Sequence, residues 1–157
     1  NDMRLSEQYK VVGLGTSADF TGGFTADSIN MANYHSVCFV LTFGTITGAG
    51  PFVLTIKSGA SAGTQTTAET FAYRYGSAAQ GSATADVYTA WATSAGFNMV
   101  VATQTTRCFI AEIEASAITA GQPWLTLAFD NGSDSGLVGA VAILVPRYAA
   151  NAIATAI

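Results

Sequence analysis

The hydrophobic positions of this chain fall into short runs with little helical periodicity. Runs rich in β-branched and aromatic residues recur about every ten to twenty residues, and clusters of Gly, Asn, Asp or Ser separate them. This pattern predicts an all-β protein. The expected strands are Tyr9 to Leu14, Val37 to Phe43, Phe52 to Ser58, Thr70 to Tyr75, Asp86 to Trp91, Phe97 to Val101, Cys108 to Glu114, Trp124 to Phe129 and Leu137 to Val145. Strands of this number and length suit an antiparallel β-sandwich that is jelly-roll-like.

Alternation within the runs assigns side chains to faces, because successive residues of a strand point to opposite sides. From Phe52 to Lys57 apolar and polar residues alternate, so one face is predicted to meet solvent. The runs Val37 to Phe43 and Leu137 to Val145 are apolar on both faces. We therefore expect these two strands in the middle of a sheet, covered on one side by the opposite sheet and on the other by a loop or a neighbouring subunit.

Two polar segments, Gly59 to Glu69 and Gly76 to Ala85, are predicted to be loops without core-forming residues. A short helix is expected from Ala115 to Ala120, where Gly121 provides a stop signal. The helix would link two strands.

The two ends of the chain are expected to be extended arms on one sandwich domain that spans residues 1–157. The arms comprise residues 1–8 and 149–157. The second arm carries Ile153 and Ile157 among small residues, without an alternation that would hold them in the core. We expect this arm to be disordered alone and to become ordered on a partner.

Charge is scarce along the chain. Of 157 residues, 6 are Lys or Arg and 10 are Asp or Glu, so 10% are charged and the net charge is -4 at pH 7. A typical soluble domain has roughly 25% charged residues. Because the few basic residues are scattered, neither nucleic acid nor a membrane is expected as a partner. The longest apolar run, Leu137 to Val145, is also far shorter than the roughly 20 residues of a membrane span.

The two cysteines, Cys38 and Cys108, each lie inside an apolar run with strand character. A thiol in such a run behaves as a small hydrophobic side chain, which favours buried free thiols. A disulfide between neighbouring strands is the alternative.

Candidate catalytic groups are few. The single histidine, His35, is next to Ser36 and near Asp27 in sequence, but the chain has no G-x-S-x-G turn to present a nucleophile. Glu112 and Glu114 are expected on one face of a strand, whereas glycosidase carboxylates flank the substrate from opposing positions. We interpret these residues as a locally hydrogen-bonded histidine and a solvated strand face, and we expect no enzymatic activity.

The segment Asp130-Asn131-Gly132-Ser133-Asp134 offers oxygen ligands, but its spacing does not match a calcium loop. Asn-Gly between two apolar runs instead predicts a tight turn. The sequence has no Cys/His set for zinc, no P-loop and no dinucleotide fingerprint. We therefore expect neither a metal nor a cofactor.

Aromatic side chains suggest one further chemistry, because their rings stack on sugars or anchor protein partners. The candidates are Tyr73, Tyr75, Tyr88, Trp91 and Trp124. For tryptophans in a sandwich, packing in the core or at its rim is the alternative interpretation.

Three segments carry a resemblance to a known family. They are DSINMANYHSVCFVLTFG at 27–44, CFIAEIEASAITAGQPWLTLAF at 108–129 and GAVAILVPRYAANAIATAI at 139–157. Together they resemble a family of small structural proteins that tailed bacteriophages encode among their head genes. In that family an Asn-Met-x-Asn-Tyr segment precedes a strand ending in Gly, and the chain closes with an Ile-Leu-x-x-Pro-Arg-Tyr-like run and a small-residue tail. The matching residues are Asn30, Met31, Asn33, Tyr34, Gly44, Pro146, Arg147 and Tyr148.

The resemblance implies a non-catalytic virion component, first of all a head decoration (cement) protein on the capsid surface. Its partners would be the major capsid protein and further copies of itself, with a homotrimer expected before a dimer, and assembly would take place in the host cytoplasm. The expected interaction residues are Tyr34, Arg147, Tyr148, Ile153 and Ile157. The alternative function is a tail-associated or carbohydrate- or receptor-binding β-sandwich module.

Overall fold

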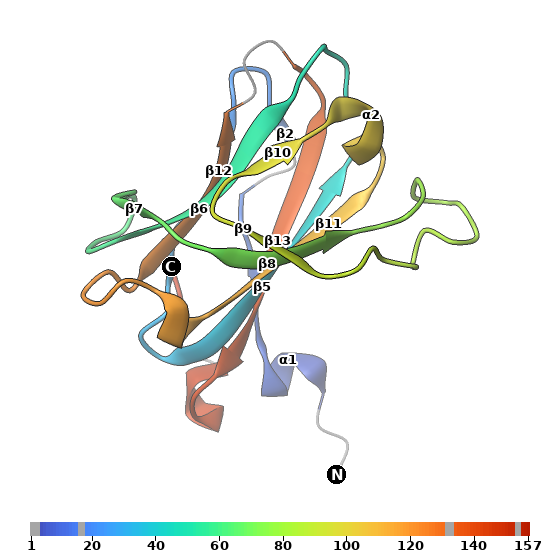
Figure 1. The fold of residues 1–157 in the computed structure, drawn as a ribbon. Helices are drawn as coiled ribbons and strands as arrows, with labels where there is room; N and C mark the ends of the chain where they lie inside the picture. Colours follow the sequence, from blue (N-terminus) through green and yellow to red (C-terminus); the bar gives the residue numbers. More distant parts are fainter. Residues whose placement is uncertain (1–3, 16–17, 131–133, 153–154) are drawn as a thin grey trace.

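The computed structural model describes residues 4–15, 18–130, 134–152 and 155–157, and in it the chain forms two packed antiparallel sheets (Figure 1). The larger sheet has the order β1 (Lys10–Gly13), β13 (Leu137–Pro146), β5 (Tyr34–Phe43), β11 (Cys108–Glu114), β8 (Phe71–Tyr75) and β9 (Ala92–Ser94), and β2 (Ala18–Asp19) also pairs with β13. The smaller sheet has the order β10 (Phe97–Met99), β6 (Phe52–Gly59), β12 (Trp124–Asp130) and β3 (Phe24–Thr25), with β4 (Ile29–Asn30) on β12 and β7 (Thr67–Ala68) on β6. The predicted antiparallel β-sandwich is confirmed.

The connections between the sheets follow a jelly-roll pattern. The chain passes from β5 in the larger sheet to β6 in the smaller one, and later from β11 to β12 and back to β13. As a result, the strand order β1-β13-β5-β11 in one sheet lies against the order β3-β12-β6-β10 in the other. Strands β8 and β9, which come between β6 and β10 in sequence, extend the larger sheet at its edge.

The core fills the space between the sheets with alternate residues of the long strands. On β5 the inward residues are Val37, Phe39, Leu41 and Phe43, and all are buried. On β13 they are Val138, Ala140, Ala142 and Leu144. Both strands have a neighbour on each side within the larger sheet, as the sequence predicts. Their other, outward-pointing side chains form a second apolar surface, which is described below.

The segment 86–91 is not the strand that its aromatic content predicts. Among its described residues, pairing is limited to an isolated bridge between Tyr88 and Gly76, and the next strand is β9. Tyr88 and Trp91 instead place their rings against the guanidinium of Arg74. The aromatic residues in this segment therefore contact Arg74 with their side chains and are not part of a regular strand.

Two further elements are shorter than expected. The strand predicted from Phe97 to Val101 ends at Met99, and a helical turn, α2 (Val101–Gln104), follows it. The helix predicted from Ala115 to Ala120 is a single 3-10 turn, η1 (Ala115–Ala117). It links β11 to β12 as expected, but it ends at Ala117 without the predicted glycine stop, and Gly121, with a φ of 79°, lies in a later turn before β12.

The loop 59–69 is anchored to the sandwich, which corrects the expectation that it has no core-forming residue. Glu69 is buried, and its Oε1 accepts hydrogen bonds from the Ser58 hydroxyl at 2.5 Å and from the Thr119 backbone N–H at 2.8 Å. Burial raises the pKa of Glu69, but the hydrogen bonds from Ser58 and Thr119 outweigh it and hold the pKa below its ordinary value. The sequence signal was missed because an isolated Glu is usually a solvent residue.

The C-terminal segment lies against the sandwich where the structure describes it, and this differs from the extended arm expected there. At the start of the chain, α1 (Leu5–Gln8) has no buried residue and contacts η2 (Ala149–Ala152). Near the end, Ala152 and Ala156 are buried, and the Asn30 N–H donates to the Ala156 carbonyl at 2.8 Å. Methyl side chains are small enough to pack on the sheets without alternation. In the described part of the chain, no helix is long and apolar enough to cross a membrane.

Candidate interaction surface

The outer side of the larger sheet, facing away from the smaller sheet, carries side chains in rows because four strands pair in register. One row consists of Val11, Ile143, Cys38 and Glu112, from β1, β13, β5 and β11. The next row consists of Gly13, Val141, Val40 and Ile110. We call the positions Val11, Gly13, Val40, Ile110, Val141 and Ile143 the apolar face. These six positions carry no charge, and they run continuously across the four strands.

The apolar face meets solvent along β1 and β13. Val11 is 47% exposed and Val141 is 38% exposed, while Val40, Ile110 and Ile143 are half-buried by their neighbours. A single exposed valine is ordinary on a protein surface, but a contiguous group of apolar side chains marks an interaction site. The sequence indicated this feature through the two strands that are apolar on both faces. It did not show that β1 and β11 continue the same surface.

A cationic cluster borders the apolar face on the side of β8. Arg74 pairs in the ladder with Ile110, and its guanidinium carbon lies 4.4 Å from the centre of the Trp91 ring and 5.0 Å from that of Tyr88. Cation–π contacts of this kind are worth about 0.5 to 2 kcal/mol. They hold the segment that contains both rings against the sheet, so this segment limits the apolar face to β1, β13, β5 and β11.

Both cysteines lie on the same outer side and are free thiols. Cys38 is opposite Glu112, whereas Cys108 is opposite Thr42, so the register keeps the two sulfurs from bonding. Burial, together with the neighbouring Glu112 carboxylate, raises the pKa of Cys38 to about 12. A hydrogen bond with Cys108 and burial raise the pKa of Tyr88 to about 12. Cys38 and Tyr88 are therefore uncharged at neutral pH. The free state is as predicted, although the thiols are half-buried rather than in the core.

The predicted interaction residues Tyr34, Arg147 and Tyr148 meet at the end of the sandwich where β5 begins and β13 ends. The Arg147 Nε donates to the Tyr34 carbonyl at 3.2 Å, and the Arg147 backbone N–H donates to the Asn33 carbonyl at 2.9 Å. Tyr148 is 74% exposed, whereas the Tyr34 ring is fully buried, and burial raises the pKa of Tyr34. Arg147 and Tyr148 are thus accessible to a partner. Tyr34 has its ring in the core, and only its backbone carbonyl takes part here, as the acceptor for Arg147.

The other two predicted interaction residues lie elsewhere. Ile157 is 58% exposed and lines a recess of about 640 Å³ with Trp124 and Thr126, on the outer side of the smaller sheet. Ile153 lies outside the described residues. The structure therefore does not bring Ile157 together with Tyr148, although the two are close in sequence.

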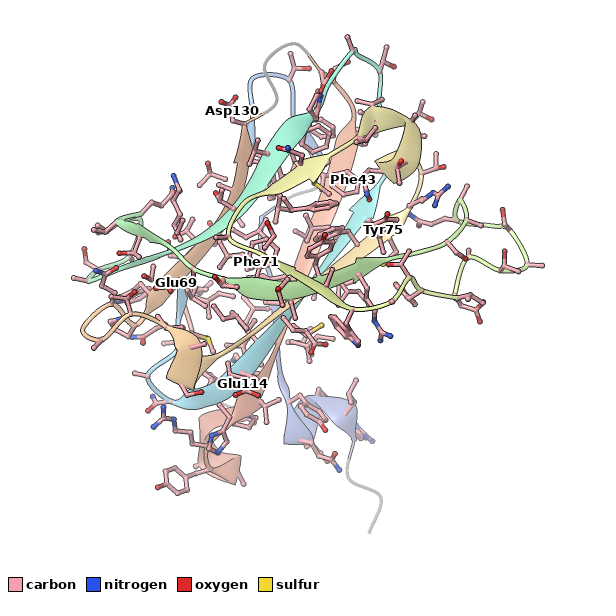
Figure 2. All side chains as sticks on the ribbon, in the orientation of Figure 1. Phe43, Glu69, Phe71, Tyr75, Glu114 and Asp130 are labelled. Atoms are coloured by element: carbon pink, nitrogen blue, oxygen red, sulfur yellow. The ribbon has the colours of Figure 1, made fainter. Side chains whose placement is uncertain are left out.

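The candidate catalytic groups do not form a Ser-His-Asp triad, because Asp27 lies apart from His35 and Ser36. His35 is exposed at the start of β5, beside Ser36, and Asp27 lies between β3 and β4 of the other sheet. Glu112 and Glu114 are both exposed on the outer side of β11, as their spacing predicts. Figure 2 shows Glu114 at the lower end of the sandwich in that view, where it lines a recess of about 450 Å³ with His35.

In the described part of the acidic segment 130–134, Asp134 has a structural role. Asp134 is buried, and its Oδ1 accepts a hydrogen bond from the Gly50 N–H at 2.9 Å, which ties the loop after β5 to the start of β13. The predicted turn at residues 131–133 lies outside the described residues. Within the described ranges, no group of three or more His, Cys, Asp or Glu residues is placed to hold a metal ion.

The aromatic candidates do not form one platform. Tyr73 and Tyr75 stack on Phe109 at centroid distances of 5.8 and 6.5 Å and pack against the core. Tyr88 and Trp91 belong to the Arg74 cluster on the outer side of the larger sheet, whereas Trp124 is half-buried on the smaller sheet.

Comparisons with known proteins identify the fold. No protein-family profile matches the chain, and no curated protein matches its sequence. Among solved structures, the crystal structure of the SPBc2 prophage-derived protein YomS is similar, with a TM-score of 0.50 and 9% sequence identity, over 87% of this chain and 91% of that chain. A likeness at this level of identity shows a shared fold.

Proposed function

We propose that this chain is a non-catalytic structural protein of a tailed-phage virion that binds the outside of the capsid and stabilises it. The apolar face carries this proposal, because an exposed, continuous and uncharged sheet surface is suited to burial against another protein. Burying charged groups at such a contact would be costly unless each found a partner. The chain has few such groups, and the apolar face has none.

Three further observations support the proposal. The chain shares its jelly-roll-like fold with a prophage-derived protein, and three of its segments resemble small head proteins of tailed phages. The accessible Arg147 and Tyr148 provide a second contact at the end of the sandwich, close to the half-buried Pro146. The proposed partners are the major capsid protein and other copies of this chain, on the capsid surface of virions assembled in the host cytoplasm.

The proposed mechanism is mechanical. A decoration protein that touches two capsid subunits binds the assembled shell better than it binds separated subunits. By mass action, its occupancy then shifts the equilibrium toward the intact shell. Many copies, each with modest affinity, multiply this effect because their sites are presented together on one particle.

The test is to locate the chain in particles. Virions are purified from a lysate of cells whose phage genome encodes it, and its copies are counted by quantitative mass spectrometry relative to the major capsid protein. Decoration predicts a copy number comparable to that of the capsid protein, added density on the shell by cryo-electron microscopy, and heads that break at a lower temperature when the gene is deleted. Absence from virions, or presence in the tail alone, would contradict the proposal.

The alternative of a carbohydrate- or receptor-binding module receives no specific support from the surface. Sugar recognition by stacking needs exposed rings that share one surface, and the five candidate aromatics are divided between the core, the Arg74 cluster and the smaller sheet. We therefore prefer the proposal that the chain binds a capsid.

A further inference from the structure

Arg147 lies between two recesses at the end of the sandwich where β5 begins. One is the recess of about 450 Å³ described above, which His35 and Glu114 line. The other has a volume of about 280 Å³ and is lined by residues 31–32 and by the connection from η1 to β12. Arg147 and Ala115 line both recesses, so the two adjoin. A ligand that reaches Arg147 can therefore enter both.

The two recesses differ in chemistry. The smaller one is lined mainly by apolar residues, of which Met31 is buried and Ile118 and Pro123 are half-buried. The larger one carries the imidazole of His35 and the carboxylate of Glu114. The surface therefore favours an apolar group on one side of Arg147 and a hydrogen-bonding group on the other.

The Arg147 guanidinium is held in place and has donors left. Its Nε donates to the Tyr34 carbonyl, and its backbone N–H donates to the Asn33 carbonyl. Among the described residues, none accepts a hydrogen bond from its two Nη atoms. A guanidinium fixed at Nε presents its other N–H groups as a planar fork, and this fork matches a carboxylate.

These positions select a ligand that combines three groups at one place. Its carboxylate binds Arg147, its apolar side chain enters the smaller recess, and its N–H turns to Glu114 in the larger one. Glu114 repels a carboxylate, which sets the direction of the ligand. The last residue of a polypeptide carries all three groups on its Cα. In an internal Asp or Glu, by contrast, the apolar group must come from another residue.

We propose that this end of the sandwich binds the C-terminal carboxylate of a partner polypeptide whose last residue is apolar. The last side chain enters the recess of Met31, Ile118 and Pro123, and the preceding residue occupies the recess of His35 and Glu114. The larger volume of the second recess favours a continuing chain over the ammonium group of a free amino acid. The inference rests on the proposed function only in taking this end of the sandwich as a contact, and it names the part of the partner that binds.

Two serines complete the polar lining of the larger recess. Ser36 is half-buried, and the hydroxyl of the exposed Ser116 donates to Glu114 Oε2 at 3.3 Å. A hydroxyl donates one hydrogen bond and still accepts others, so Ser116 has capacity for a peptide N–H. A peptide unit needs both a donor and an acceptor, and the larger recess offers both kinds.

The contact is small, so a single chain end is expected to bind weakly. One Arg–carboxylate pair at an exposed position and one buried side chain should give a dissociation constant on the order of 1 mM for a short peptide. Many copies on one particle make such weak contacts effective, because the chain ends are then presented together.

The first experiment titrates the full chain with N-acetyl-alanyl-leucine and follows backbone amide signals by nuclear magnetic resonance. Signals of Ala32, Ala115 and Ile118 should shift and saturate. The same peptide with a C-terminal amide lacks the carboxylate, and N-acetyl-alanyl-glycine lacks the apolar side chain. Each should bind about tenfold or more weakly. Equal binding of the amide would overturn the inference, as would tighter binding of free leucine.

The second experiment changes the protein. Arg147→Gln removes the charge and the fork, so it should weaken binding of N-acetyl-alanyl-leucine by about tenfold or more. Ile118→Asp places a carboxylate at the smaller recess and should have a similar effect. Lys57→Gln, which removes a cation from the outer side of the smaller sheet, is the control and should bind as the wild type.

Wild-type affinity of the Arg147→Gln protein would contradict the proposed site. Circular dichroism and thermal melting check the fold of each variant. If a variant does not fold, the comparison between the peptide and its C-terminal amide on the wild-type protein decides the matter.

Virion incorporation separates this inference from the proposed function. If the chain is present on heads but does not bind N-acetyl-alanyl-leucine, the chain-end site is wrong and the proposed function stands. If the peptide binds with the expected selectivity but the chain is absent from virions, the proposed function is wrong and the chain-end site stands.

Discussion

The two outer surfaces of the sandwich share one strand geometry and differ in chemistry. On the smaller sheet the outward residues of β6 and β12 are Val53, Thr55, Lys57, Trp124, Thr126, Ala128 and Asp130. On the larger sheet the corresponding positions of β1, β13 and β5 are almost all apolar. Val53 is 39% exposed and Val141 is 38% exposed, yet Val53 has a threonine beside it along its strand and Val141 has Val40 beside it. The neighbours of an exposed residue, rather than its exposed fraction, therefore indicate a binding surface.

The largest expected effect separates the inner and outer sides of one strand. Phe39→Ala removes a buried ring from β5 and should lower the free energy of unfolding by roughly 2 to 5 kcal/mol. Val40→Ala, one residue along on the half-buried apolar face, should cost less than about 1 kcal/mol. Urea unfolding at low concentration measures both, and equal losses would contradict the assignment of the two sides.

The second prediction is that the C-terminal segment stabilises the smaller sheet by packing against it. Removal of residues 155–157 takes away the Ala156 methyl group and its hydrogen bond with Asn30, so the free energy of unfolding should fall by about 1 to 2 kcal/mol. Ile157→Ser is the control, because this side chain is more than half exposed. An unchanged melting temperature after truncation would restore the interpretation of the tail as a free arm.

The third prediction is that Arg74 holds the Tyr88 and Trp91 rings at the border of the apolar face. Arg74→Ala should remove two cation–π contacts, lower the free energy of unfolding by about 1 kcal/mol and shift the fluorescence of Trp91 toward that of a solvent-exposed indole. Lys57→Ala on the outer side of the smaller sheet, where no such cluster is described, serves as the control. If the fluorescence of the Arg74→Ala protein is unchanged, the ring is held by other contacts.

The smallest effect on stability is expected when the pH is lowered. The folded-state pKa of Glu69 lies below its ordinary value of 4.5, so the stabilisation from its ionised form is present above that value and is lost as the pH falls through the folded-state pKa. The melting temperature should therefore fall on acidification below about pH 4.5. The fall should be smaller in the Glu69→Gln protein. Glu114→Gln, at an exposed position, should behave as the wild type. A fall of the same size in the Glu69→Gln protein would assign the acid effect to other carboxylates.

The long strands were predictable from sequence and the short or local elements were not. β5, β6, β11, β12 and β13 appear close to their predicted bounds, because many buried positions repeat at the period of a strand. The segment 86–91 was predicted wrongly, since Tyr and Trp favour strands on average but here bind the side chain of Arg74. The strands β2, β3, β4 and β7 have only two residues each, and so short a segment shows no periodicity in the sequence.

The candidate surface was predictable in part. Two strands with apolar residues on both sides indicated that the larger sheet has a second contact surface, and the structure supplies β1 and β11 as its remaining strands. Arg147 and Tyr148 are exposed where the sequence suggested a contact, while the Tyr34 ring is in the core. Whether these residues bind a capsid is a prediction that the experiments above test.

By itself the sequence determined the fold class, the central strands and the low charge, because these depend on composition and on periodicity along one strand. Only the tertiary structure decided which side chains share a surface, since rows across a sheet depend on the register between strands that are distant in the chain. Val11 and Glu112 lie in one row although about a hundred residues separate them, and Arg74 lies beside Ile110 on the same outer side although it comes from β8. The buried Glu69 and Ala156 follow the same rule, because hydrogen-bond partners and packing space are supplied by segments far away in sequence.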